Sequence, residues 1–376
     1  TDSYGPIPYS KMQNGTFSVP YDSQRDVYMA MIDDLDAAME TLYTFASAGD
    51  GILMRDFDIS SFKGDSRLWV SFANTLKLRM AIRMSGVEPE ARRIAEEAVR
   101  DMATYGLIDA NAENLSFSSD SRQNPFYTQA TSTSWQDLRS NASIVMYMNA
   151  YEDPRRASYF SKSGYDGIYV GVRAGIQNVT PTDYATYSYP LFAEKDPVPV
   201  MYASESWFLR AEGALLGWTM GDTAENLYNT GVKTSLELWG NGSSYETYIA
   251  SETAPALSYA DPRNKHNVSD FGTAVSVKWA DDGNELERII TQKWIANHMI
   301  GHEAWADVRR TGYPRLLQVV NNLSGGMWGN VDSSKGMRRL HYPQSEYDNN
   351  RENVLRGVEL LGGSDLHGTD VWWAKK

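Results

Sequence analysis

The sequence predicts a mainly α-helical protein that carries long irregular loops. Two observations support this fold class. Apolar residues recur every three or four positions over several stretches of the chain, as on the buried face of an amphipathic helix. Long segments rich in Gly, Pro, Ser, Asn and aromatic residues separate these helical parts. The 376 residues, of which 42% are hydrophobic, are enough to bury a large core. We expect a single domain over 1–376.

Three helices are predicted in the first part of the scaffold, about 22–104. Asp22 and Ser23 are good helix-starting residues, Gly86 suits a helix end, and Pro89 suits the first turn of the helix after it. Three apolar stripes have helical spacing: Val27, Met31, Leu35, Met39 and Leu42; Leu68, Phe72, Leu76, Met80 and Met84; and Ala91, Ile94, Ala95, Ala98 and Met102. The second and third helices are expected to form a hairpin.

A second hairpin is predicted over about 204–250, with a turn at Gly221-Asp222. Its two stripes are Trp207, Ala211, Ala214, Leu215 and Trp218, then Ala224, Leu227, Tyr228, Gly231, Ser235 and Leu238. Small residues among bulky ones let two helices approach closely, and each hairpin takes about 35 residues, as in tetratricopeptide repeats. A last helical section is expected over about 284–311, with these residues on its core side: Leu286, Ile289, Ile290, Trp294, Ile295 and Ile300. The predicted scaffold is therefore tetratricopeptide-like.

Two long stretches, about 105–203 and 251–282, lack helical periodicity, and so does the chain after Tyr313. Loops of this length inside a compact chain are uncommon and usually functional. We therefore expect the first two stretches to form a face of loops and short strands that holds a ligand.

Charge and composition exclude several classes of function. The formal net charge is -13 at pH 7, and no cluster of Lys and Arg is dense enough to neutralise several neighbouring phosphates, so no nucleic acid partner is expected. The chain has no Cys, which excludes disulfides, thiolate metal sites and a Cys nucleophile. No apolar run approaches the roughly 20 residues that are needed to cross a bilayer.

No catalytic residue, metal site or cofactor is predicted. His298 and His302 have a spacing that can bind a transition metal on a helix, but their neighbours match neither the zincin motif nor its inverted form, and no metal site is expected there. The 48 acidic residues always allow some carboxylate pair, so a glycoside hydrolase stays open as the less favoured alternative. The run Asp281–Glu285 offers oxygen ligands for a structural calcium ion, yet it is too short for an EF-hand loop, and a helix-capping turn is favoured.

Aromatic residues in the loops are the candidate ligand contacts. A sugar ring presents a face of C–H groups that stacks on an aromatic ring, while its hydroxyl groups pair with amides and charged side chains. The first predicted contact set is close together in sequence: Trp135, Tyr127, Arg139 and Asn141. Trp279 and Trp328 are further candidates. Stacked rings and hydrogen bonds at about 1 kcal/mol each would give a Kd from about millimolar to tens of micromolar. Packing of the loops onto the scaffold is the alternative role.

Three segments carry a distinctive combination of motifs: Glu205–Trp218, Gln292–Ala296 running on to Arg309–Pro314, and Gly362–Trp373. Together they resemble the SusD/RagB family, the surface-exposed nutrient-binding lipoproteins of Bacteroidetes outer membranes. The likeness covers nearly the whole chain, including Tyr21–Gln24, Lys77–Ala81 and Arg338–Pro343. The segment Gly164–Gly171, with Pro199–Met201, is closer to the RagB-like branch than to the starch binder.

The resemblance implies a lipidated cysteine that anchors the protein to the cell surface, and a SusC-like TonB-dependent transporter as partner. The segment that carries this anchor is expected to precede Thr1. The protein is then no enzyme; it captures an oligosaccharide, or a peptide, and delivers it to the transporter in polysaccharide utilisation. Two alternatives stay open here: a helical interaction scaffold or transporter lid without its own ligand, and a surface glycoside hydrolase.

Overall fold

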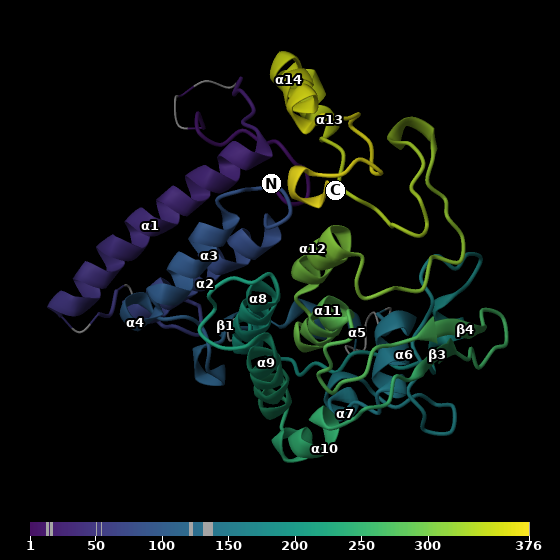
Figure 1. Cartoon of the computed structure of the whole chain (residues 1–376). Helices are drawn as coiled ribbons and strands as arrows, with labels where there is room; N and C mark the ends of the chain where they lie inside the picture. The colour runs from purple at the N-terminus through teal and green to yellow at the C-terminus, as the bar shows by residue number, and fades with distance from the viewer. Residues whose placement is uncertain are drawn as a thin grey trace.

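The computed structural model describes residues 1–12, 15, 18–49, 51–53, 55–119, 123–130 and 138–375. Most of its regular structure is helical (Figure 1). The helices are α1 (Gln24–Ala48), α2 (Ser66–Arg83), α3 (Ala91–Arg100), α4 (Met102–Tyr105), α5 (Pro125–Ala130), α6 (Ala142–Ala150), α7 (Arg156–Tyr159), α8 (Ala203–Leu215), α9 (Ala224–Leu238), α10 (Tyr245–Ile249), α11 (Glu285–Ala296), α12 (Gly301–Thr311), α13 (Gln344–Asn349) and α14 (Arg351–Leu361). None of these helices has the length and apolarity needed to cross a membrane.

The described residues also form two small antiparallel sheets. Strand β1 (Leu115–Phe117) pairs with β2 (Val198–Met201), and β3 (Ala256–Tyr259) pairs with β4 (Val268–Thr273). A mainly helical protein with short-strand insertions is therefore confirmed.

The two predicted helical hairpins are present, since α2 packs on α3 and α8 packs on α9. Small residues permit this close approach, as the sequence predicted. A Cβ atom at Gly231 of α9 would lie 3.0 Å from the ring of Phe208 on α8, and one at Gly213 would lie 2.6 Å from the sulfur of Met220. The Asp65 carboxylate caps α2 by accepting from the Arg67 backbone N–H at 2.9 Å.

The stretches without helical periodicity contain helices that the sequence analysis missed. Helix α6 has no polar face: Val145, Met146, Tyr147 and Met148 are all buried, so no 3.6-residue period marks it. Helices α13 and α14 follow Tyr313, in the part of the chain that was expected to be irregular. Their turns are few, and short periodic runs are weak signals in a sequence.

The last helical section is two helices where one continuous run was predicted. Helix α11 ends at Ala296 and α12 begins at Gly301. Met299 between them has φ 71°, the left-handed conformation that ends a helix. The break turns α12 away from α11 and directs the following segment toward the loops of β3 and β4 (Figure 1).

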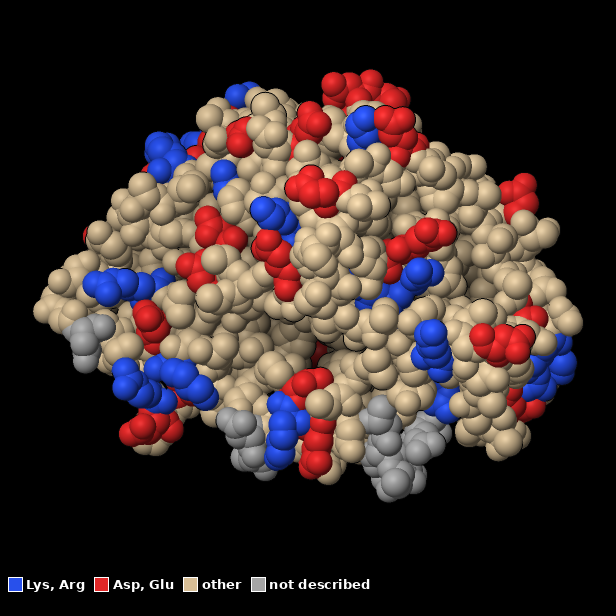
Figure 2. All heavy atoms as spheres, turned by 90° about the horizontal axis from the view of Figure 1, so that it is seen from below, with Lys and Arg blue, Asp and Glu red and all other residues tan. Residues whose placement is uncertain are grey.

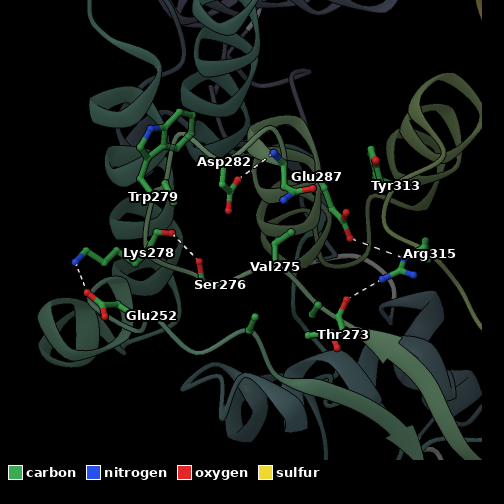
Figure 3. A pocket seen from close by; sticks show the side chains of 14 residues that line it. Glu252, Thr273, Val275, Ser276, Lys278, Trp279, Asp282, Glu287, Tyr313 and Arg315 are labelled. Carbon is green, nitrogen blue, oxygen red and sulfur yellow. Dashed lines mark hydrogen bonds and ion pairs between the residues drawn. The ribbon is translucent and has the colours of Figure 1, made fainter.

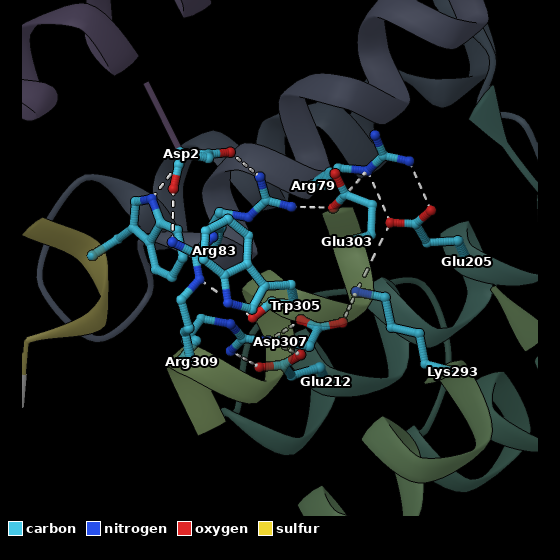
Figure 4. Close-up of polar contacts among 12 residues, drawn as sticks. Asp2, Arg79, Arg83, Glu205, Glu212, Lys293, Glu303, Trp305, Asp307 and Arg309 are labelled. Carbon is cyan, nitrogen blue, oxygen red and sulfur yellow. Dashed lines mark hydrogen bonds and ion pairs between the residues drawn. The ribbon is translucent and has the colours of Figure 1, made fainter. Parts of the chain in front are cut away.

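A network of buried ion pairs joins the helices at the centre of the molecule (Figure 4). Arg79 of α2 donates through Nε and Nη2 to the Glu205 carboxylate of α8, at 2.8 and 2.7 Å. Lys293 of α11 lies 3.9 Å from Glu205 and 2.9 Å from the Asp307 carboxylate of α12. Since each carboxylate meets cations from other helices, the network sets the positions of α2, α8, α11 and α12 relative to one another.

Burial and pairing act on Asp307 in opposite directions. Burial raises the pKa of this carboxyl, but Lys293 and Arg310 outweigh it and lower the pKa to about 2. Asp307 is therefore ionised at neutral pH. Because this pKa is depressed, the ionised Asp307 stabilises the fold at pH values above the ordinary pKa of 3.8. This contribution to stability is lost as the pH falls toward 2.

Charged side chains on the surface are mixed in sign. Figure 2 shows acidic and basic residues interspersed over the face seen from below, and its described residues form no continuous basic patch.

We predict that Glu205→Gln lowers the free energy of unfolding by about 3 kcal/mol, because it removes the carboxylate that accepts both close hydrogen bonds of buried Arg79 and leaves only the longer pair with Glu303 at 3.5 Å. Urea denaturation at pH 7 measures the change. The matched control is Glu359→Gln, which removes the exposed pair with Arg356 and is expected to change stability by less than about 0.5 kcal/mol. Equal denaturation midpoints for the two variants would contradict the importance given to the network.

Candidate functional site

A cavity of about 810 Å³, called here the first cavity, lies between the segment after α10, the end of β4 and the start of α11 (Figure 3). Figure 3 shows Trp279 on one side and Arg315 on the other, with Asp282 and Glu287 between them. Most of its lining comes from 252–287, which overlaps the second stretch of the predicted ligand face, about 251–282, whereas no described residue of the first stretch, about 105–203, lines it.

Trp279 offers an aromatic surface that is positioned by its own turn. Its indole Nε1 donates to Asp281 Oδ1 at 3.0 Å. Its ring packs against Tyr228 of α9, with centroids 5.5 Å apart and planes at 51°. The ring is half-buried and lines the cavity, so it is held in place while part of its surface stays accessible to a ligand.

Glu287 places a carboxylate in the cavity from the first turn of α11. The residue is only 8% exposed. Its one ion pair is long, 3.9 Å from Oε1 to Arg315 Nε, and among the described residues its carboxylate accepts no hydrogen bond. Burial raises the pKa of Glu287, although Arg315 and Arg288 act in the opposite direction. A buried acceptor that faces a cavity without a hydrogen-bond donor is suited to a ligand hydroxyl group.

Arg315 forms the opposite wall of the cavity. Its guanidinium donates from Nη2 to the backbone carbonyl of Thr273 at 2.7 Å, and nearly half of its side chain is exposed. Gly272 is required beside it, because this residue has φ 107° and a Cβ atom there would lie 3.3 Å from Arg315 Nη1. Arg315 thus links the end of β4 to the start of α11 across the cavity.

The remaining charged groups of the first cavity are mostly paired with one another or with neighbours. Lys278 Nζ lies 2.6 Å from Glu252 Oε1, in an exposed pair. Asp282 accepts from Arg288 Nη2 at 3.0 Å. The lining is therefore polar but nearly balanced in charge.

The predicted contact residues lie in different places. Asn141 is exposed and caps α6, accepting from the Ser143 backbone N–H at 2.8 Å. Arg139 donates to the backbone carbonyl of Tyr184 at 3.1 Å, and Tyr127 is half-buried on α5. Trp135 lies outside the described residues, so the contact set around it stays a prediction.

Trp328 and Trp279 were the further candidates, and the structure places them apart. Trp328 stacks on His341, with ring centroids 3.4 Å apart and planes at 19°, and it does not line the first cavity. Trp279 does line it. Sequence reasoning did not select Glu287, Tyr313 or Arg315, because these residues come from separate segments and no local pattern marks them as neighbours.

The motif His298–His302 is not a metal site. The helix break separates the two residues, and His298 is buried, with its ring stacked on Tyr159 at a centroid distance of 4.0 Å, whereas His302 is exposed. Across the described part of the chain, no three or more His, Asp and Glu side chains are grouped to bind a metal ion. In the run Asp281–Glu285, Glu285 accepts from the Gly283 backbone N–H at 2.9 Å, which is a turn contact before α11.

Comparison with known proteins agrees with the arrangement of the helices. A family model described as "SusD-like: Susd and RagB outer membrane lipoprotein" matches residues 1–374. A chitin-binding SusD homologue from Flavobacterium johnsoniae has 40% identity and a TM-score of 0.93, covering 100% of this chain and 78% of that one. A SusD homologue from Bacteroides uniformis has 42% identity and a TM-score of 0.90 at the same coverage. A SusD-like protein from Bacteroides thetaiotaomicron has 40% identity and a TM-score of 0.89, again at that coverage. No curated protein matches the sequence.

We predict that Glu287→Gln stabilises the fold by about 0.5–1 kcal/mol at pH 8, while it weakens binding of any ligand in the first cavity. Because the pKa of Glu287 is raised in the folded protein, ionisation of this carboxyl lowers the stability of the folded state relative to the unfolded state. This cost is present at high pH and disappears as the pH falls through the range in which Glu287 protonates. Thermal denaturation of both proteins at pH 8 and pH 4 measures the difference, and a variant that is less stable at pH 8 would contradict the prediction.

We also predict that His298→Phe makes the protein more resistant to acid. Burial lowers the pKa of His298 to about 3, from an ordinary value of 6.5. The unfolded chain therefore binds a proton that the folded chain does not, and stability is lost as the pH falls from 6.5 toward 3. At pH 5 this loss is about 2 kcal/mol for the parent and absent for the variant. Urea denaturation of the parent and the variant at pH 8 and pH 5 measures this loss. The prediction is contradicted if the free energy of unfolding depends on pH equally in the two proteins.

Proposed function

Because this chain belongs to the SusD/RagB family of outer membrane lipoproteins, whose members are non-catalytic binding proteins, we propose that it binds a glycan in the first cavity and delivers it to a SusC-like TonB-dependent transporter. The observation that carries the proposal is a cavity of about 810 Å³ that has the Trp279 ring on one side and the Glu287 carboxylate and the Arg315 guanidinium toward the other. Cavities of about 300–1,000 Å³ hold ligands of drug size, which includes a short oligosaccharide.

The chemistry of the cavity fits a sugar. The C–H face of a pyranose stacks on an aromatic ring, as it would on Trp279, and such contacts contribute about 1 kcal/mol. Sugar hydroxyl groups both donate and accept, so they can donate to Glu287 and accept from Arg315. The near balance of charge around them favours a neutral glycan over a highly charged one, because a strongly anionic ligand would face three carboxylates: Glu252, Asp282 and Glu287.

N-acetylated glycans are the first ligands to test. A structurally similar protein with 40% identity is described as chitin-binding, and chito-oligosaccharides are neutral, as the cavity requires. Extended peptides, the other ligand class expected from the sequence, belong in the same panel as a comparison.

Delivery to the transporter is inferred from family membership. In Figure 1 the helices α1, α2 and α3 lie at the upper left, whereas β3, β4 and α11 lie toward the lower right. Helices α1, α2 and α3 can therefore contact a partner without covering the first cavity. Weak binding suits this role, because the glycan has to leave the cavity when the transporter takes it up.

We predict that Trp279→Ala weakens binding of chito-oligosaccharides by about tenfold or more, since it removes the stacking surface. Calorimetric titration of the folded protein measures Kd. Trp279→Phe keeps a smaller ring and should retain part of the affinity. The matched control is Trp218→Ala, which truncates a half-buried Trp of the α8–α9 hairpin, a residue that does not line the first cavity. Equal Kd values for Trp279→Ala and the parent would refute the site.

A further inference from the structure

A second cavity, of about 1,010 Å³, meets the first at Arg315. Among the described residues, Arg315 alone lines both cavities. Of the residues next to it, Tyr313 lines the first cavity, whereas Gly312, Pro314 and Leu316 line the second. The two spaces are therefore neighbours across one side chain.

Two regular elements run along both cavities. Glu287 of α11 lines the first cavity and Trp294 lines the second. They are seven positions apart in the sequence, which is close to two helical turns and places both on the same face of α11. Thr273 of β4 lines the first cavity and Phe271 the second. Gly272, with φ 107°, lies between them. Residues of α11 and of β4 therefore line both cavities.

Arg315 crosses the space between these two elements. Its guanidinium donates to the Thr273 carbonyl on β4 and lies 3.9 Å from the Glu287 carboxylate on α11. Both links are made by a side chain that is 46% exposed. Its position is well supported, because the Arg315 backbone carbonyl accepts from Tyr147 Oη of α6 at 3.0 Å. A guanidinium at this junction is available to a ligand from either cavity.

The second cavity differs from the first in its chemistry. Aromatic and aliphatic side chains dominate its lining, including Trp294, Trp305 and Phe271. Three apolar side chains at its edge remain exposed to solvent: Leu316 at 38%, Val319 at 41% and Met337 at 39%. A ligand with apolar faces or acyl substituents would remove this surface from water, which is favourable.

We propose that the two cavities form one cleft for an extended oligosaccharide, which passes Arg315 and places acylated or C–H-rich sugar units in the second cavity. This proposal rests on the proposed function of the first cavity. Each cavity by itself is of the size that holds a drug-sized ligand, so a chain of a few units fills the first, and only a longer chain reaches the second. Arg315 then pairs with hydroxyl or acyl oxygens at the junction.

The test is a calorimetric titration of the intact chain with chito-oligosaccharides of two and six units. A six-unit chain contains five two-unit segments, so a gain of up to about fivefold arises from statistics alone. We expect the six-unit chain to bind more than tenfold tighter to the parent. Leu316→Asp, which puts a charge at the apolar edge, should abolish this gain and leave two-unit binding unchanged. Arg315→Ala should weaken binding of both lengths.

Leu355→Asp is the matched control, because Leu355 on α14 is a similarly exposed Leu that lines neither cavity. It should keep the length-dependent gain. If Trp279→Ala weakens binding but the six-unit chain binds no more than fivefold tighter than the two-unit chain, the extended cleft is overturned and the proposed function stands. Loss of the gain in Leu355→Asp as well would also count against the cleft. Binding of neither chain length would overturn both proposals.

Discussion

The buried ion-pair network is the interaction on which the arrangement of the helices depends. Arg79, Glu205, Lys293 and Asp307 come from four different helices and meet where almost no water reaches them. Removing charges from water is costly, and it is offset only when every charge finds a partner of good geometry. The network therefore tolerates only one arrangement of α2, α8, α11 and α12. Hydrophobic packing around it supplies most of the stability but is less selective for geometry.

The position of the candidate site follows from that arrangement. Lys293 and Asp307 hold α11 and α12 together, the break at Met299 sets their relative direction, and the chain leaving α12 brings Arg315 opposite Glu287. The scaffold is fixed by charges satisfied inside the protein. The cavity, by contrast, keeps Glu287 buried without a donor and Arg315 half exposed. Polar groups left incompletely paired cost stability, and they are the groups that a ligand can satisfy.

Much of the helical scaffold could be predicted from the sequence, because amphipathic stripes and small residues at helix contacts are local patterns. Gly231 against Phe208 is an example. The missed helices show the limit of such patterns: α6 is buried on all sides, so it has no polar face to reveal its period. The helical section predicted over 284–311 is interrupted after Ala296, where Met299 takes a left-handed conformation before α12 begins at Gly301. An isolated Gly inside a helical pattern is a weak signal for such a break.

The sequence by itself determined the fold class, the family motifs and the absence of thiolate sites, and it selected Trp279 as a candidate aromatic contact. It also offered His298 with His302 as a pair, and only the tertiary structure placed one in the core and the other in solvent. The meeting of Trp279, Glu287 and Arg315 was likewise decided by the tertiary structure. Helix patterns depend on neighbours three or four residues apart, whereas this site is assembled by packing between segments whose separation in sequence carries no information about their distance in space.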